Sequence, residues 1–170
     1  RDLRMSRGLG DVYKRQGQIA IFNRSHYEDI IAVRVKKIFP DPVWKRRYKH
    51  VLDFESMLAE EGTVIIKLFL NISKAEQKKR LESRLQDPDK LWKFCMDDLD
   101  DRNRWDEFQT AYQDLIEKTS TPEAPWYIIP ADRKWYRNLV VARLMVEKLR
   151  HLQLSLPTPN FDPASIIIPD

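Results

Sequence analysis

The sequence contains one short segment in which residue types suited to phosphate chemistry follow an apolar run. Residues 22–29 (FNRSHYED) carry an amide in Asn23, a guanidinium in Arg24 and carboxylates in Glu28 and Asp29. Arginine binds phosphate oxygens through two parallel N–H groups, and amide and carboxylate oxygens are hard ligands for Mg²⁺ or its water shell. The segment predicts a site for phosphate and a divalent cation, while a solvated loop with incidental charges fits the same residues equally well.

A second group of residues gathers positive charge on one predicted helix and the loop behind it. Its members are Lys78, Lys79, Arg80, Arg84, Lys90 and Lys93. Because Arg80 and Arg84 stand four residues apart, they share one helical face and are placed to bind a polyanion. An ordinary solvated helix is the alternative, since Glu76 and Glu82 can pair with some of these charges and the acidic run at 97–101 offsets the rest.

The overall composition describes one globular domain. The chain has 170 residues, 42% of them hydrophobic, with 30 Lys and Arg, 26 Asp and Glu, and a formal net charge of +4. The sequence contains no run of 18 apolar residues, so no membrane helix is predicted. The lone Cys95 excludes an internal disulfide and a multi-cysteine zinc site. No nucleophilic triad can be built from one cysteine and three histidines, and His26 fits a structural role as well as an acid–base role. We expect a cytoplasmic protein that does not enter a membrane.

The first 16 residues differ from the rest of the chain. They show neither helical nor strand periodicity, and residues 11–16 (DVYKRQ) resemble the translated transposon end used to prepare sequencing libraries. We expect a non-native leader at 1–16, with the natural protein starting near Gly17 and its own amino-terminal part missing; a native disordered arm is the alternative. The leader holds five of the 30 basic and two of the 26 acidic residues, which leaves 25 and 24, a net charge of +1.

Strands and helices alternate along the remaining chain. We expect a strand at 18–22, a helix from Asp41 and Pro42 that Gly62 ends, and a buried strand at 63–72. The apolar face of that first helix carries Trp44, Tyr48, Val51, Leu52, Glu55 and Leu58. Ser73 and Glu76 predict a capping box that starts the basic helix.

The second half of the chain continues this alternation. Asp87 and Pro88 end the basic helix, and a charged, aromatic-rich segment follows that we expect to be a loop or a lid. We expect a helix from about Asp97 that residues 120–125 interrupt, a strand at 126–129 and a helix from Asp132, before a proline-rich tail at 156–170. The last helix has an expected apolar face of Trp135, Leu139, Ala142, Met145, Val146 and Leu149. Such alternation predicts an α/β fold with a mainly parallel sheet flanked by helices.

Three polar loops follow the expected strands. They span residues 23–29, 72–74 and 130–134. Because ligands of parallel sheets bind at the carboxyl ends of the strands, we expect these loops to converge on one rim.

The combination of these motifs resembles the polyphosphate kinase type 2 family. The resemblance covers about residues 17–155 and rests on 22–29 (FNRSHYED), 67–77 (KLFLNISKAEQ), Arg80, Arg84, Trp92, Lys93, Asp98, Leu99, 104–106 (RWD), 119–126 (TSTPEAPW) and 129–134 (IPADRK). It implies a P-loop kinase fold similar to thymidylate kinase. It also implies Mg²⁺-dependent transfer of phosphate between inorganic polyphosphate and a nucleotide, in a homo-oligomer. The FNRSHYED form, followed by Arg34, is similar to the branch that acts on nucleoside mono- and diphosphates. The resemblance implies AMP, ADP and ATP as nucleotide partners, with the direction of transfer left open.

The resemblance also implies roles for individual residues. It places Arg24 on phosphate, and Glu28 and Asp29 near the nucleotide or its metal. The lid residues that would contact the phosphate chain are Arg80, Arg84 and Lys93, with Arg133 as a weaker candidate. Asn23 stands where many members have an aspartate in the Walker B motif, which puts its own role as a metal ligand in question.

One family motif is not found in this sequence. The glycine-rich Walker A loop should precede the strand before residue 23, but residues 8–17 (GLGDVYKRQG) contain no Gly-Lys pair. The first strand and the Walker A loop are therefore expected to be missing. Since phosphoryl transfer depends on that loop, its lysine and Mg²⁺ for positioning and charge stabilisation, we expect the 170-residue chain alone to be inactive.

Two other functions fit the same residues. One is a nucleotide kinase that uses ATP as the donor, and the other is a noncatalytic fragment that binds polyanions through its lid. Nucleic acid is not an expected partner, because a net charge of +1 without an aromatic and basic RNA-binding motif gives a weak electrostatic footprint.

Overall fold

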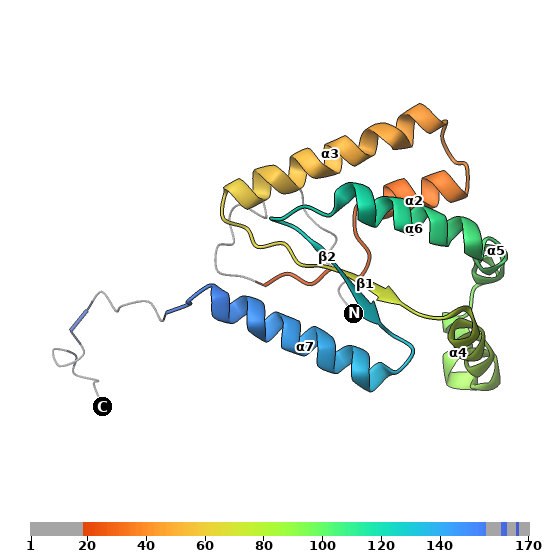
Figure 1. The fold of residues 1–170 in the computed structure, drawn as a ribbon. Coiled ribbons are helices and arrows are strands. Elements are labelled where there is room, and N and C mark those ends of the chain that lie inside the picture. Colours follow the sequence, from red (N-terminus) through yellow and green to blue (C-terminus); the bar gives the residue numbers. More distant parts are fainter. Residues whose placement is uncertain (1–18, 156–160, 163–165, 167–170) are drawn as a thin grey trace. The chain divides into compact units, whose positions relative to one another are not determined.

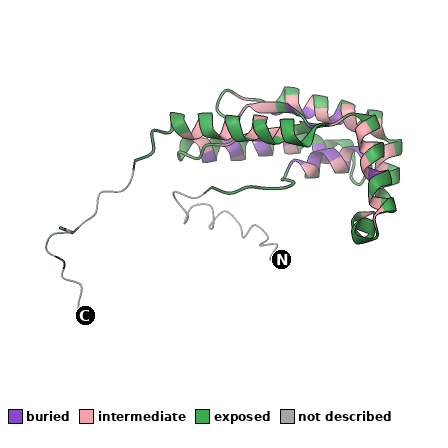
Figure 2. Cartoon of the chain, turned by 90° about the horizontal axis from the view of Figure 1, so that it is seen from below, coloured by how far each residue is buried: buried purple, intermediate pink, exposed green. Residues whose placement is uncertain are grey.

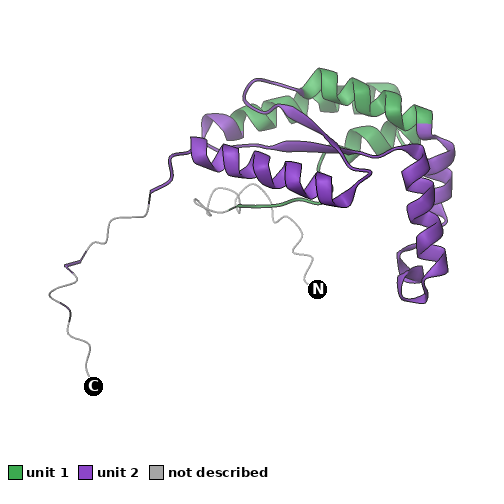
Figure 3. Ribbon diagram, turned by 60° about the horizontal axis from the view of Figure 1, so that its bottom comes forward, with its two compact units in different colours: residues 1–57, 106–119 green, residues 58–105, 120–170 purple. Residues whose placement is uncertain are grey.

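The computed structural model describes residues 19–155, 161, 162 and 166 (Figure 1). The expected leader at 1–16 and most of the expected tail at 156–170 lie outside the described residues. The chain divides into two compact units, one from residues 1–57 and 106–119 and the other from residues 58–105 and 120–170 (Figure 3). We refer to them as the first unit and the second unit.

Helices form the described core of the first unit. They are α2 (Glu28–Val35), most of α3 (Asp41–Glu60) and α6 (Trp105–Thr119) from its second residue onward. Buried apolar side chains come from all three helices and from the residue before α2: Tyr27, Ile30, Ile31, Val33, Val35, Trp44, Tyr48, Val51, Ala111 and Leu115. On α3 these positions recur every three or four residues, so the expected apolar face of this helix is confirmed.

Helix α3 ends as predicted, at a glycine. Gly62 has a φ of +84°, its N–H donates to the Ala59 carbonyl at 2.9 Å, and Thr63 N–H donates to the Leu58 carbonyl at 2.9 Å. These two bonds form a Schellman motif, in which a residue without a Cβ adopts the left-handed conformation at the least cost.

The second unit contains a parallel pair of strands. β1 (Lys67–Asn71) pairs with β2 (Trp126–Pro130) in a register that sets Lys67 opposite Trp126 and Asn71 opposite Pro130. Three helices, α4 (Lys74–Gln86), α5 (Asp97–Asn103) and α7 (Lys134–His151), accompany them, with a 3₁₀ turn η1 (Pro88–Lys93). Parallel strands joined through helices confirm the expected α/β class. β2 begins at the expected residue and extends one residue beyond the expected strand at 126–129, whereas β1 forms only part of the expected strand at 63–72.

The expected strand at 18–22 is not formed over its described residues, 19–22. Ile19, Ile21 and Phe22 are 65%, 81% and 66% exposed. A β-strand is stable only beside a hydrogen-bonded neighbour, and the described sheet contains β1 and β2 and no partner for this segment. Apolar composition alone predicted the strand, and the pairing it requires is absent from the described residues.

Two expectations about helices are also wrong. The helix expected from about Asp97 to the interruption at 120–125 is broken at Arg104 and forms α5 and α6. Four of the seven residues of α5 are aspartates, which have low helix propensity, so the break follows a weak helical segment. The last helix begins at Lys134 instead of Asp132, and none of its residues is buried (Figure 2). Trp135 of the expected apolar face is 63% exposed.

Within the described residues, no helix is both long and apolar enough to cross a membrane.

One ion pair joins α2 to α6 inside the first unit. Arg34 donates to Asp114 Oδ2 at 2.6 Å, and its guanidinium lies 5.1 Å from the centre of the Trp44 ring. The hydrogen bond from Arg34 holds the pKa of the Asp114 carboxyl below its usual value near 3.8. Both side chains are only partly exposed, so water screens this pair less than the surface pairs of α3.

We predict that Asp114→Asn lowers the free energy of unfolding at pH 7 by about 1 kcal/mol, because the charge on Arg34 loses its partner. The folded-state pKa of Asp114 is depressed, so the carboxylate stabilises the fold above pH 3.8 and this contribution disappears as the pH falls through the lower folded value. Urea titrations from pH 7 down to pH 2.5 measure the difference. The matched control is Asp53→Asn, which removes an exposed 2.6 Å pair with Lys49; an equal loss in both variants contradicts the prediction.

Candidate functional site

The loop predicted to bind phosphate forms a tight turn that leads into α2. Glu28 N–H donates to the Ser25 carbonyl at 3.1 Å, and Asp29 N–H donates to the His26 carbonyl at 3.2 Å. Arg24 has a backbone φ of +76°, in the left-handed region that residues other than glycine rarely adopt. Its exposed guanidinium lies 3.3 Å from the Glu28 carboxylate. The turn thus presents an accessible arginine beside an acidic helix start.

The two predicted metal ligands, Asn23 and Asp29, are both exposed. The Asp29 carbonyl accepts a hydrogen bond from Arg47 of α3, which fixes its backbone. Among the described residues, no three His, Cys, Asp or Glu side chains are grouped to hold a metal ion. Mg²⁺ usually keeps several waters and needs only one or two carboxylates beside substrate phosphates. The oxygen donors of Asn23 and Asp29 fit such a partly hydrated ion and form no closed cage.

A buried hydrogen bond ties this loop to α3. Tyr27, 4% exposed, donates its hydroxyl to Glu55 Oε1 at 2.6 Å. The His26 ring stacks on Tyr27 at 4.6 Å and meets Phe54 edge-on at 5.8 Å, and His26 Nε2 lies 3.8 Å from the same carboxylate oxygen. Burial, reinforced by the hydrogen bond to Glu55, raises the pKa of the Tyr27 phenol far above its ordinary value near 10. Tyr27 therefore remains a neutral donor at physiological pH.

In the second unit, the loops after β1 and β2 lie side by side, as expected for neighbouring parallel strands. Ala131 N–H donates to the Asn71 carbonyl at 2.8 Å, and Ser73 N–H donates to Asp132 Oδ1 at 2.7 Å. The Ser73 hydroxyl accepts the Glu76 N–H at 3.1 Å, which confirms Ser73 as the N-cap of α4. Half of the predicted capping box is wrong, because Asp132 takes the Ser73 N–H that Glu76 was expected to bind.

Glu76 instead pairs with the first predicted lid arginine. Arg80 Nε lies 2.7 Å from Glu76 Oε1, and its Nη2 donates to the carbonyls of Ala131 at 2.7 Å and Asp132 at 3.1 Å. With its side chain only 25% exposed, Arg80 connects α4 to the loop after β2. Its structural contacts are thus more extensive than those of an ordinary surface arginine.

The other predicted lid residues are more open to solvent. Arg84 Nη1 lies 3.3 Å from Asp98 Oδ2 of α5 and 3.4 Å from the Lys93 carbonyl. Lys93 Nζ lies 5.0 Å from the centre of the Trp92 ring, which is 74% exposed. Arg133 is exposed at the N-cap position of α7. The lid is therefore a helical segment, α4, η1 and α5, with cations on its surface.

The predicted site residues are divided between the two units. Arg24, Glu28 and Asp29 belong to the first unit, and Arg80, Arg84, Lys93 and Arg133 to the second. Convergence on one rim is confirmed for the loops at 72–74 and 130–134, and for the loop at 23–29 it remains a prediction.

Three residues with structural roles near these loops were missed by the sequence analysis. Asp132 was expected to start a helix, and Arg102, which bonds the Lys74 carbonyl and Gln77 Oε1 at 2.8 Å each, lies in the expected lid without an assigned role. The buried contact of Glu55 could have been predicted, because Glu55 is a carboxylate on the apolar face of a predicted helix. A charge in that position must have a buried partner.

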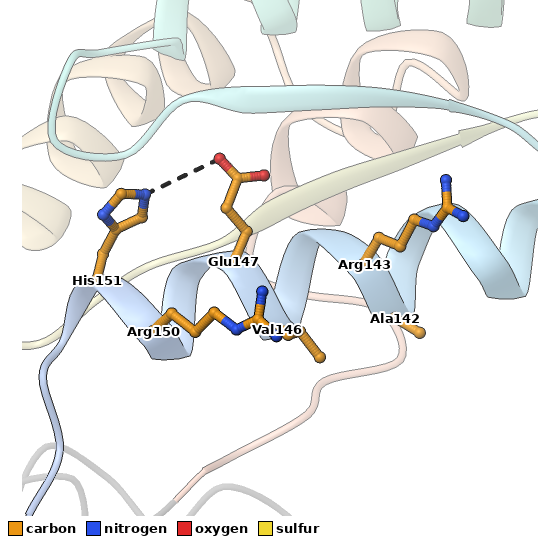
Figure 4. A pocket seen from close by; sticks show the side chains of 6 residues that line it. All are labelled: Ala142, Arg143, Val146, Glu147, Arg150 and His151. Carbon is orange, nitrogen blue, oxygen red and sulfur yellow. Dashed lines mark ion pairs between the residues drawn. The ribbon is translucent and has the colours of Figure 1, made fainter.

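A shallow depression on α7 is unrelated to these residues. It is lined by one helix alone, as Figure 4 shows: Ala142, Arg143, Val146, Glu147, Arg150 and His151. His151 Nε2 and Glu147 Oε1 are 4.0 Å apart along its edge. Because no second element closes the depression and no predicted site residue reaches it, we do not consider it a candidate active site.

Comparison with known proteins places the sequence and the fold in one group. Residues 12–156 match the family described as Polyphosphate kinase 2. The chain is 53% identical over 154 residues to a Meiothermus ruber protein named AMP/ADP-polyphosphate phosphotransferase, covering 91% of this chain and 58% of that protein. A Rhodopseudomonas palustris protein named ADP-polyphosphate phosphotransferase is 37% identical over 154 residues, with coverage of 84% and 53%.

The fold agrees with this result. The crystal structure of Polyphosphate Kinase 2 from Arthrobacter aurescens TC1 superposes with a TM-score of 0.81 at 48% identity, covering 85% of this chain and 51% of that one. The chain spans about half the length of these relatives. Matches over most of its own length in sequence and in fold nevertheless settle its ancestry: the chain belongs to the polyphosphate kinase 2 family.

Proposed function

We propose that this chain is part of a phosphotransferase that moves phosphate between inorganic polyphosphate and AMP or ADP. The observation that carries the proposal is the 53% identity, over 91% of the chain, to a protein named for that reaction. The exposed cations of the phosphate loop and the lid suit a polyanionic substrate. In the proposed assignment, residues 17–155 form the kinase domain, and the protein works in the cytoplasm as a homo-oligomer.

In this proposal, the loop at 23–29 meets the reacting phosphates. The Arg24 guanidinium binds phosphate oxygens and stabilises the charge that spreads over them during transfer. Asp29, with Asn23 as a further oxygen donor, holds the water shell of Mg²⁺, and Glu28 lies near the nucleotide. When bound, Mg²⁺ neutralises phosphate charge. Little proton transfer is needed in such a reaction, so we assign no general base.

The polyphosphate chain is proposed to bind along the lid. Lys93 is exposed there, Arg84 is partly exposed, and Arg133 lies at the N-cap position of α7. Arg80 also orders the loop after β2 through its two carbonyl contacts, so its contribution to phosphate binding is partly indirect. A phosphate approaching Arg84 competes with the carboxylate of Asp98.

We predict that the 170-residue chain alone does not transfer phosphate, because it contains no Gly-Lys pair to cradle phosphate oxygens. A chimera in which the amino-terminal part of the Meiothermus ruber relative precedes Gly17 is expected to convert AMP to ADP, and ADP to ATP, with polyphosphate and Mg²⁺. Separation of labelled nucleotides measures the products. In the chimera, Arg24→Ala should lower kcat by about 100-fold or more, the usual cost of losing a transition-state donor.

The alternatives give different results in the same assay. Turnover with ATP but not polyphosphate as the donor identifies a conventional nucleotide kinase. A folded chimera that binds polyphosphate without any turnover supports the noncatalytic reading. Either result contradicts the proposed reaction.

We also predict that the charges around Arg84 set the affinity of the chain for tripolyphosphate. Arg84→Ala should weaken binding about tenfold, and Asp98→Asn should strengthen it about threefold, because the competing carboxylate is removed. Titration calorimetry at fixed ionic strength measures both. Asp100→Asn removes the same charge from α5 without touching the pair with Arg84 and is the matched control. Equal gains in the two aspartate variants indicate a general charge effect and contradict the prediction.

A further inference from the structure

We propose that Tyr27 and Glu55 are positioning residues, whose buried hydrogen bond holds the loop at 23–29 in the conformation that places Arg24 for phosphoryl transfer. This inference rests on the proposed function. Neither residue is assigned above to phosphate, nucleotide or metal binding, and the pair connects the loop to α3 across 28 positions of sequence.

The first support is the burial of a carboxylate on an apolar helix face. The Glu55 side chain is 5% exposed, and its position at helical spacing from buried Val51 places it on the apolar face of α3. A carboxylate in such a place is costly unless it is hydrogen bonded, and a methionine or leucine would pack there without that cost. The 2.6 Å hydrogen bond from Tyr27 therefore fixes the orientation of the Tyr27 side chain, which non-directional apolar packing would not do.

The second support is the position of Tyr27 within the loop. It precedes Glu28 directly and follows Arg24 by three residues, and its carbonyl accepts the N–H groups of Ile30 at 3.0 Å and Ile31 at 3.1 Å. Fixing the Tyr27 side chain thus fixes the residue from which the first turn of α2 is built.

The third support is the strained backbone beside it. A left-handed conformation at Arg24 persists only where the surrounding structure enforces it. The exposed Arg24 side chain makes a single described ion pair, with Glu28, which is itself exposed. The Tyr27–Glu55 bond, three residues later, is a buried constraint on this turn beside the exposed contact of Arg47 with the Asp29 carbonyl. In the proposal, the direction of the Arg24 guanidinium depends on this buried bond.

Two measurements test the proposal. Hydrogen exchange by NMR on the 170-residue chain reports loop order, and steady-state kinetics on the chimera described above report turnover. Tyr27→Phe and Glu55→Met each remove the hydrogen bond, whereas Glu55→Gln keeps an acceptor oxygen and is the conservative control. In the first two variants, we expect exchange of the Glu28, Asp29 and Ile30 amides to accelerate at least tenfold, with unchanged exchange in the β1–β2 ladder.

In the chimera, the same two variants should lower kcat about tenfold, and Glu55→Gln should stay within threefold of the parent. The double variant should lose no more than either single variant, because the two residues act as one unit. Leu115→Ala, a cavity in the core of the same unit, is the stability control: it should lower Tm but keep kcat at temperatures where it is folded. Glu55→Met should show the reverse pattern, with kcat lost and Tm kept.

The possible failures are distinguishable. Unchanged exchange in Tyr27→Phe and Glu55→Met overturns the proposal, and so does accelerated exchange with kcat within twofold of the parent chimera. If the parent chimera is inactive while exchange accelerates as expected, the proposed function fails; the loop-holding role stands, but its link to phosphoryl transfer is overturned.

Discussion

Every backbone N–H and C=O group must hydrogen bond to water or to another protein group, and this constraint organises the loops of both units. Where the β1–β2 ladder ends, side chains take over: Asp132 accepts the Ser73 N–H, and Arg80 donates to two carbonyls of the neighbouring loop. In the first unit, Arg47 donates a hydrogen bond to the Asp29 carbonyl in the same way. The backbone around the candidate site residues is therefore held by charged side chains, Arg47 and Arg80 from helices and Asp132 from the loop after β2.

Under this arrangement, some arginines of the chain stabilise loops and others stay accessible to a ligand. Arg80 has a mainly structural role, because its described contacts are one carboxylate and two carbonyls and its side chain is mostly buried. Arg24 and Arg84 each face one carboxylate at 3.3 Å and stay accessible. Exposed pairs of this kind contribute at most about 1 kcal/mol, so an incoming phosphate, which binds arginine strongly, can displace the carboxylate.

The sequence predicted the parts of the structure that depend on local patterns. The helical spacing of α3, its glycine end and the Ser73 cap of α4 are all decided within a few residues, and all three were correct. The segment 19–22 was wrong because a strand depends on a neighbour that local composition does not reveal.

The same distinction applies to the candidate site. The types and order of Arg24, Glu28 and Arg84 were visible in the sequence, but their partners were not. Asp132 replaced Glu76 at the Ser73 N–H because β1 and β2 are parallel neighbours, and the chain separates these two residues by 59 positions. Glu55 lies 28 positions from Tyr27, and only its presence on an apolar helix face indicated a buried contact.

The Arg84 side chain is held by hydrogen bonds and remains partly exposed to a ligand. Binding usually costs about 0.5–1.5 kcal/mol for each long side chain that must be immobilised. Arg84 is already directed by two acceptors, the Asp98 carboxylate and the Lys93 carbonyl. The carboxylate opposes a phosphate, whereas the carbonyl is neutral and can remain bonded while the phosphate takes the place of Asp98. In the proposed role of Arg84, part of this ordering cost is therefore met before a phosphate arrives.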